Sequence, residues 1–282
     1  MPKAKVQIVT DTTSGLTPEV AEAHDIVLMP QIVIFGEESY RDDTEMDTRT
    51  FLEKLRTSPT LPKTAAPPPA LFTPVFERLA AEGYTVLCLH PSTELSGTVR
   101  SAVVAAHDFP EADIRVIDTR TIAAPLATMA LLAARWVREG IDPDTIVDRV
   151  HDLMARQRVY FVVDTLEYLH KGGRIGGAKA LLGSVLQIKP ILTLKDGRVE
   201  PFEQQRTKRR ALARLRELVL TECPRSDEAH LCVMHADAEA EAERLASDFA
   251  AELGLSNVPI YELPPAIVVH AGPGVLATSF FT

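Results

Sequence analysis

The chain has 282 residues, of which 46% are hydrophobic and 24% are charged. This composition is typical of a soluble globular protein, and the length is sufficient for one large domain or two of ordinary size. The formal net charge of −9 argues against nucleic acid as the main partner, because phosphate binding needs a surplus of lysine and arginine.

The first half of the chain alternates strand-like and helix-like segments. Strands are predicted at 6–9, 26–34 (interrupted by Pro30), 85–90 and 114–117, and helices at 15–24, 47–56, 70–82, 99–108, 128–139 and 143–156. Thr17 is the expected N-cap of the first helix, with Pro18 in its first position. This alternation predicts a largely parallel sheet with helices on both faces, in a domain spanning residues 1–157. Ligands of such sheets bind beyond the carboxyl ends of the strands.

The second half, residues 158–282, predicts another α/β domain with a mixed sheet. An apolar strand at 159–163 is followed by a glycine-rich loop, and residues 195–198 predict a hairpin turn. A basic helix containing Arg214 and Arg216 comes next, and its run of cations is typical of a solvated helix face; docking of an acidic protein is the alternative. A strand at 231–235, a helix at 238–253 and two further strands complete the domain.

Cysteine usage and hydropathy indicate the compartment. Cys88, Cys223 and Cys232 are odd in number and widely spaced, which indicates neither a disulfide framework nor a metal site. The first residues are too polar for a signal peptide, and no window approaches about 18 uninterrupted apolar residues. These features predict a cytoplasmic protein without a membrane span.

Two hydroxyl residues lie near predicted helix starts. Thr64 precedes the proline-rich start of the helix at 70–82, and Ser96 with Gly97 connects a strand to the helix at 99–108. Free N–H groups at a helix N-terminus bind anions, so each hydroxyl is a candidate either for helix capping or for binding an anionic ligand. Taken alone, capping is the favoured interpretation for Thr64. The residue two before Ser96 is Glu94, so the segment is not a nucleophile elbow.

The glycine-rich run 171–177 contains Arg174 and predicts a loop that wraps closely around a neighbour. It matches neither a phosphate-binding P-loop nor a dinucleotide-binding loop, and an ordinary structural turn is the alternative. His270 follows the β-branched residues 267–269, which predict a strand. Its range from neutral to cationic makes it a candidate partner for a carboxylate, or else a structural histidine. Neither the histidine spacing nor the loop residues Asp11, Asp42 and Asp43 predict a metal site.

Taken in order, the motifs resemble the DegV family from end to end. They are TDTTSGL (10–16), KTAAP (63–67), STELSGT (92–98), LEYLHKGGRIGG (166–177), QRTKRRAL (205–212) and VHAGPG (269–274). The resemblance implies two α/β domains with a cavity between them that buries one long-chain fatty acid. It implies a non-catalytic carrier that serves as the lipid-binding subunit of a system with a separate ATP-dependent fatty acid kinase. It implies no cofactor beyond the fatty acid, and it is compatible with transient contact with a membrane surface.

The resemblance also implies the residues of the site. Thr64 and Ser96, with Gly97, would hydrogen-bond the fatty-acid carboxylate, and His270 would complete their polar surroundings. Arg174 and Arg206 would lie around them, with Arg206 facing the kinase. The apolar segment 178–194 is a candidate wall for the acyl chain, although ordinary core packing explains it equally well.

The sequence departs from the family pattern at two of these motifs. Ala65 stands where the family usually has a serine, and Val269 where it usually has a threonine. The hydroxyl network around the carboxylate is therefore expected to be thinner than in relatives.

Two other functions fit some of the same residues. A hydrolase or acyltransferase would use Ser96 as the nucleophile and His270 as the base, and would need a third group to orient the histidine. A carrier of another small anion, such as a phosphosugar, would use the helix N-termini to bind phosphate.

Overall fold

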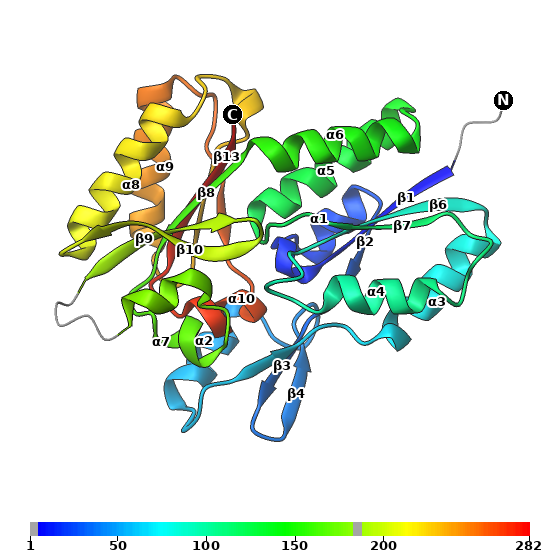
Figure 1. Ribbon diagram of the computed structural model, residues 1–282, viewed down its shortest axis with the longest axis horizontal. Helices are drawn as coiled ribbons and strands as arrows, with labels where there is room; N and C mark the ends of the chain where they lie inside the picture. The colour runs from blue at the N-terminus through cyan, green and yellow to red at the C-terminus, as the bar shows by residue number, and fades with distance from the viewer. Residues whose placement is uncertain (1–4, 183–187) are drawn as a thin grey trace. The chain divides into compact units, whose positions relative to one another are not determined.

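The structure is a computed structural model that describes residues 5–182 and 188–282 (Figure 1). The chain divides into two compact units. Unit 1 comprises Met1–Asp47 and Thr60–Ala155, and unit 2 comprises Thr48–Pro59 and Arg156–Thr282. Unit 1 thus ends at Ala155, near the boundary predicted between residues 157 and 158. Residues 48–59, which lie inside the first predicted domain, belong to unit 2.

Unit 1 is built on a parallel sheet with the strand order β2-β1-β6-β7. Its regular elements in chain order are β1 (Lys5–Asp11), η1 (Thr12–Ser14), α1 (Pro18–Ala23), β2 (Ile26–Met29), β3 (Ile32–Phe35), β4 (Glu38–Arg41), β5 (Lys63–Ala65), α3 (Pro69–Ala81), β6 (Tyr84–His90), α4 (Thr98–Ala106), β7 (Ile114–Asp118), α5 (Ala124–Glu139) and α6 (Pro143–Arg156). The prediction of a parallel sheet in the first half is thus confirmed.

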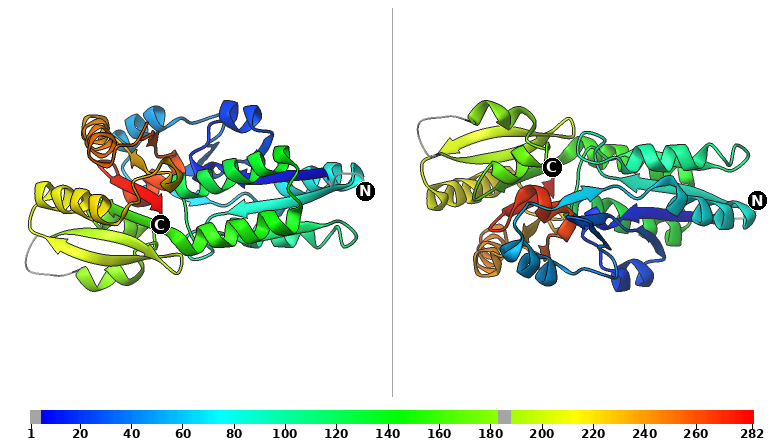
Figure 2. Two further views of the ribbon diagram at one scale, coloured as in Figure 1. Left: turned by 90° about the horizontal axis from the view of Figure 1, so that it is seen from above. Right: turned by 90° about the horizontal axis from the view of Figure 1, so that it is seen from below.

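Helices α3 and α4 of unit 1 pack side by side against the sheet (Figures 1 and 2). Phe72 and Phe76 of α3 are fully buried against Val9 of β1 and Cys88 of β6. At the N-terminal end of the unit, the Thr17 side chain accepts a hydrogen bond from the Val20 N–H, as predicted from its position before α1.

The strand candidate at 26–34, interrupted by Pro30, forms two separate strands. Proline has no N–H group to donate to a strand ladder, and Pro30 divides the segment into β2 and β3. β2 joins the parallel sheet, whereas β3 turns away into a separate antiparallel sheet with the order β4-β3-β5. Gln31 lies in the connection between the two strands, where its side chain reaches Asp11 and Thr98.

Unit 2 contains a mixed sheet with the order β10-β9-β8-β13-β11-β12, which confirms the prediction for the second half. Its elements are α2 (Thr48–Thr57), β8 (Gln157–Val162), α7 (Glu167–Lys171), η2 (Gly176–Leu181), β9 (Lys189–Lys195), β10 (Arg198–Gln205), α8 (Lys208–Glu222), η3 (Asp227–Ala229), β11 (Cys232–His235), α9 (Glu239–Leu253), β12 (Ile260–Glu262), α10 (Pro265–Ala271) and β13 (Leu276–Phe281). The predicted hairpin joins β9 to β10 through Asp196 and Gly197, both with positive φ.

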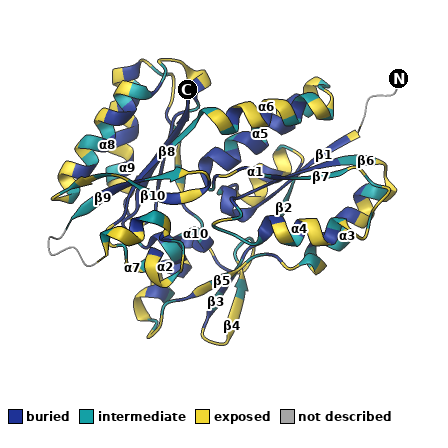
Figure 3. Cartoon of the chain, viewed as in Figure 1, coloured by how far each residue is buried: buried dark blue, intermediate teal, exposed yellow. Residues whose placement is uncertain are grey.

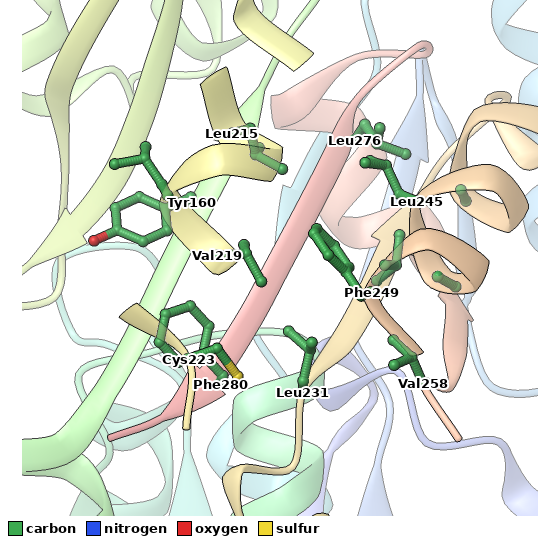
Figure 4. Close-up of a cluster of buried hydrophobic side chains, with 14 of the residues drawn as sticks. Tyr160, Leu215, Val219, Cys223, Leu231, Leu245, Phe249, Val258, Leu276 and Phe280 are labelled. Carbon is green, nitrogen blue, oxygen red and sulfur yellow. The ribbon is translucent and has the colours of Figure 1, made fainter. Parts of the chain in front are cut away.

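The core of unit 2 lies between its sheet and helices α8 and α9 (Figure 4). Strand β13 is buried along its whole length (Figure 3), and Phe249 and Phe280 are fully buried in this cluster. At the surface of α8, Arg214 pairs with Glu203 of β10 at 2.9 Å and Arg216 with Asp248 of α9 at 3.1 Å. These surface ion pairs support the solvated-face interpretation of the basic helix.

Helix α2 is attached to unit 2 although it is distant from the rest of that unit in sequence. The Thr48 hydroxyl donates to the Leu263 carbonyl at 3.0 Å, and Arg56 pairs with Asp237 at 2.9 Å. Part of the predicted cavity wall at 178–194, namely residues 183–187, lies outside the described residues. Within the described ranges, no helix is both long and apolar enough to cross a bilayer.

Candidate functional site

Thr64 lies in the short edge strand β5, opposite Val33 of β3, and is partly exposed. Helix α3 begins only at Pro69, and its N-cap is Pro68, which makes no side-chain capping bond. The interpretation of Thr64 as a helix cap is therefore wrong, because the intervening prolines extend the chain and move the helix start beyond the reach of the hydroxyl.

Ser96 lies in the loop between β6 and α4, immediately before the N-cap Gly97. Its Oγ accepts from the Thr98 N–H at 3.3 Å and lies 2.8 Å from the Thr98 Oγ1. A Cβ placed on Gly97 would lie 3.5 Å from the Cβ of Ala66. The Thr64 and Ser96 segments are therefore neighbours in unit 1, at a separation where a methyl group at position 97 would make ordinary van der Waals contact with Ala66.

A buried polar network at the carboxyl ends of β1 and β6 reaches Ser96 through Thr98. The Gln31 side-chain amide donates to Thr98 Oγ1 at 2.9 Å and to Asp11 Oδ1 at 3.0 Å. The other carboxylate oxygen of Asp11 accepts from His90 Nδ1 at 2.7 Å, and both of these side chains are fully buried. The network thus connects the strand ends to the loop that carries Ser96.

A second acidic group, Asp42, lies beside this network. Its Oδ1 accepts from the Thr12 hydroxyl at 2.7 Å and from the Gln31 N–H at 2.9 Å, whereas its Oδ2 is buried without a hydrogen-bond partner among the described residues. Burial raises the pKa of Asp42 to about 7, despite these two hydrogen bonds, and the nearby charge of Asp11 acts in the same direction. Asp42 is therefore partly protonated near neutral pH.

His270 of unit 2 lies in helix α10, so the strand predicted at 267–269 is wrong. Pro264 and Pro265 set the first positions of the helix, and the backbone N–H of Gly272 closes it on Val268. Burial lowers the pKa of His270 to about 4, and the charge of Arg174 lowers it further. The ring is consequently neutral near pH 7, and its role as a carboxylate partner stays a prediction.

Gly172, in the glycine-rich run, packs directly against His270. A Cβ at Gly172 would collide with the His270 Nδ1 and lie 2.9 Å from the Tyr168 carbonyl oxygen. Arg174 donates from Nη1 to the Gly172 carbonyl at 2.7 Å, and burial lowers its pKa. The run therefore wraps around its own unit, and this packing brings Arg174 and His270 together.

Arg206 is exposed, between the end of β10 and Thr207, the N-cap of α8. Lys208, two residues later, pairs with Asp164 at 2.7 Å and donates to the Gly274 carbonyl at 3.2 Å. The predicted residues thus form two groups: Thr64, Ser96 and Gly97 in unit 1, and Arg174, Arg206 and His270 in unit 2. How the two groups contribute to one site stays a prediction.

Within unit 1, the hydrogen bonding of Ser96 differs from that of a hydrolase nucleophile. Its hydroxyl partner is the Thr98 hydroxyl, whereas the buried histidine of the unit, His90, is engaged with Asp11. General-base activation requires an imidazole within hydrogen-bond reach of the attacking oxygen. Among the described residues, no group of three histidine, cysteine, aspartate or glutamate side chains is arranged to hold a metal ion.

The comparisons with known proteins cover nearly the entire chain. A family model described as an uncharacterised protein of the DegV family matches residues 5–282. A DegV domain-containing protein of Halalkalibacterium halodurans is 37% identical over 98% of both chains. The DegV protein of Bacillus subtilis is 31% identical over 96% of this chain and 97% of its own length.

Solved structures agree with these relatives. A fatty-acid-binding DegV family protein from Thermus thermophilus superimposes with a TM-score of 0.90 at 31% identity, covering 99% of each chain. The Bacillus subtilis DegV structure, described as a fatty acid binding protein, gives a TM-score of 0.87 at 31% identity, with 99% of this chain and 100% of that one covered. Both matches extend over the two units and their candidate residues.

Proposed function

The chain belongs to the DegV family, and from this we propose that it binds one long-chain fatty acid and holds its carboxylate with Thr64 and Ser96. The observation that carries the proposal is the whole-chain match to the Thermus thermophilus and Bacillus subtilis proteins, which are both described as binding fatty acids. The cavity between the two units and the cytoplasmic location belong to the same proposal.

The local geometry of unit 1 supports the carboxylate clamp. Gly97 and Ala66 lie close to each other, so the two hydroxyl-bearing segments are neighbours, and both Thr64 and Ser96 are partly exposed. Hydrogen bonds from neutral hydroxyl groups suit a carboxylate that must stay reachable, because a deeply buried salt bridge has a high desolvation cost. Ala65 leaves Thr64 without a second hydroxyl beside it in the sequence.

Enclosure of the acyl chain supplies most of the affinity in this proposal. Burial of hydrocarbon contributes about 0.8 kcal/mol per CH₂, so a chain of about 16 carbons contributes on the order of 10 kcal/mol before the costs of association. The apolar residues of 178–182 and 188–194 are candidates for part of the wall. The carboxylate then sets the orientation of the ligand more than its affinity.

We further propose that the bound carboxylate is presented to a separate ATP-dependent fatty acid kinase. The sequence contains no phosphate-binding P-loop, and the proposal therefore assigns the phosphorylation step to another protein. Exposed Arg206 is proposed to face that kinase, while Arg174 and neutral His270 provide the polar surroundings on unit 2. The chain itself performs no catalysis in this scheme.

Native mass spectrometry of the gently purified protein tests the first step. We expect one fatty acid per chain, identified after extraction, and lipid-free protein that also refuses added palmitate or oleate would refute the proposal. A ligand released as a phosphorylated sugar would instead support the small-anion alternative.

Site variants test the clamp. We expect Ser96→Ala and Thr64→Val to lower acyl-phosphate formation by a partner kinase about tenfold, since each removes one hydrogen bond to a charged group. Ser101→Ala, which removes a hydroxyl from the same helix α4, is the matched control and should retain full activity. Unchanged turnover in both site variants would contradict the clamp. Hydrolysis of an acyl ester that disappears in Ser96→Ala would favour the hydrolase alternative.

A further inference from the structure

The groups around Ser96 determine which atoms donate and which accept in its hydrogen bonds. A hydroxyl group has one proton to donate and two lone pairs that accept. Ser96 Oγ accepts from the Thr98 N–H at 3.3 Å and lies 2.8 Å from Thr98 Oγ1. Which of the two hydroxyl groups donates in the second contact depends on the other partners of Thr98.

Thr98 is fully buried, and its second partner is a donor. The Gln31 Nε2 lies 2.9 Å from Thr98 Oγ1 and 3.0 Å from Asp11 Oδ1. A carboxylate accepts hydrogen bonds only, so Asp11 fixes the Gln31 amide with its NH₂ group toward both partners. Thr98 Oγ1 therefore accepts from Gln31. Thr98 is 0% exposed, and among the described residues its hydroxyl proton has no acceptor other than Ser96 Oγ, so that proton is directed to Ser96.

Asp11 is held firmly in this role. Its Oδ1 also accepts from the Thr13 N–H at 3.0 Å and the Thr13 hydroxyl at 2.6 Å, and its Oδ2 accepts from His90 at 2.7 Å. Asp11 and His90 are 0% exposed and Gln31 is 3% exposed, so water does not compete for these bonds. The order of donors and acceptors is thus set before any ligand arrives.

We propose that Gln31 and Thr98 are positioning residues that fix Ser96 as a hydrogen-bond donor to an anionic ligand. With both lone pairs of Ser96 occupied by Thr98, the Ser96 proton is the part of the hydroxyl that remains available. It favours a ligand head group that accepts strongly, such as a carboxylate, over a neutral one. This inference rests on the proposed fatty-acid function and adds residues that do not themselves touch the ligand.

Thr98→Val tests this relay because it keeps the shape of the side chain and removes the hydroxyl. We expect the dissociation constant for oleate to rise about tenfold, whereas that for oleyl alcohol changes by less than about threefold, since hydrogen bonds to charged groups are the stronger ones. Thr98→Ser should restore oleate binding, and Ser101→Ala is the control on the same helix. If Thr98→Val does not fold, Gln31→Met, which removes the amide donor, should show the same selectivity for oleate.

The outcomes separate this inference from the function on which it rests. Equal losses for oleate and oleyl alcohol would indicate a purely structural role for Thr98 and overturn the relay. Wild-type protein that binds oleate, with Ser96→Ala weakened but Thr98→Val and Gln31→Met unchanged, would also overturn the relay and leave the clamp intact. Wild-type protein that fails to bind oleate at all would overturn the proposed function and the relay with it.

Discussion

The two units hold their candidate residues by different physical means. In unit 1, Ser96 is oriented by hydrogen bonds that run through Thr98 and Gln31 to the buried pair of Asp11 and His90. In unit 2, His270 is confined by space, because Gly172 lacks the Cβ that would collide with the imidazole ring. The first arrangement depends on which atoms donate and accept, and the second on which atoms are absent.

This difference explains why substitutions of similar size should act differently in the two units. Isosteric changes that remove a donor or acceptor disturb the network of unit 1 while its volume stays constant. Adding a single methyl group disturbs the packing of unit 2 without changing any charge.

Asp11→Ala should give the largest loss of stability. It leaves His90 Nδ1, the Thr13 N–H and the Gln31 amide without their shared acceptor, which is expected to cost about 3–5 kcal/mol of unfolding free energy. Urea unfolding followed by the fluorescence of Trp136, the one tryptophan of the chain and a residue of unit 1, measures this cost.

Asp113→Ala is the matched control for Asp11→Ala in the same unit. Asp113 is 47% exposed and pairs with Arg115 at 2.8 Å, so its loss should cost less than about 1 kcal/mol. Similar unfolding midpoints for the two variants would contradict the view that the buried network of unit 1 is held by its central carboxylate.

Gly172→Ala should have an intermediate effect, located in unit 2. Its φ of −75° suits alanine, so the whole cost, about 1–3 kcal/mol, comes from displacing His270 or the Tyr168 carbonyl. Gly173→Ala distinguishes a steric clash from backbone strain. Gly173 has a φ of +72° but nothing within 4 Å of its Cβ position, so this variant should cost about 1 kcal/mol through backbone strain alone. The imidazole resonances of His270 should shift in Gly172→Ala and stay unchanged in Gly173→Ala. A shift in both would indicate a general loosening of the loop.

The sequence predicts the local part of this arrangement better than the long-range part. Ser96 and Gly97 stand out because a strand, a Gly-containing loop and a helix follow one another within a few residues. The partnership of Asp11 and His90 joins residues 79 positions apart, and only the pairing of β1 with β6 brings them together. Periodicity along the chain carries no information about such pairs.

One mistaken prediction and one residue that the sequence does not reveal both depend on tertiary structure. The β-branched residues 267–269 favour a strand, but two prolines start a helix there and packing against α7 retains it. No local feature of the sequence marks Gln31 as a site residue, since a glutamine after a proline resembles any loop residue. Its role depends on two buried acceptors, Asp11 Oδ1 and Thr98 Oγ1, that meet it only in the folded chain.

The pH dependence of stability offers the finest comparison of the units, because Asp42 and His270 act with opposite signs. The pKa of Asp42 is raised from 3.8 to about 7, so as the pH falls between these values the folded chain gains a proton before the unfolded chain does, and stability rises. The pKa of His270 is lowered from 6.5 to about 4. As the pH falls over that range, the unfolded chain gains the proton first, so the stability of the folded chain decreases.

Asp42→Asn and His270→Asn separate these two contributions. Asparagine at 42 keeps an oxygen that can accept from Thr12 and the Gln31 N–H, and it removes the titration. Relative to the wild type, Asp42→Asn should therefore become less stable as the pH falls from about 8 to 5, and His270→Asn more stable, each by on the order of 1–2 kcal/mol. Trp136 fluorescence follows unit 1 in these urea titrations, and far-UV circular dichroism follows both units. If both variants became less stable, or both more stable, relative to the wild type as the pH falls, the opposite effects predicted from the burial of Asp42 and His270 would be wrong.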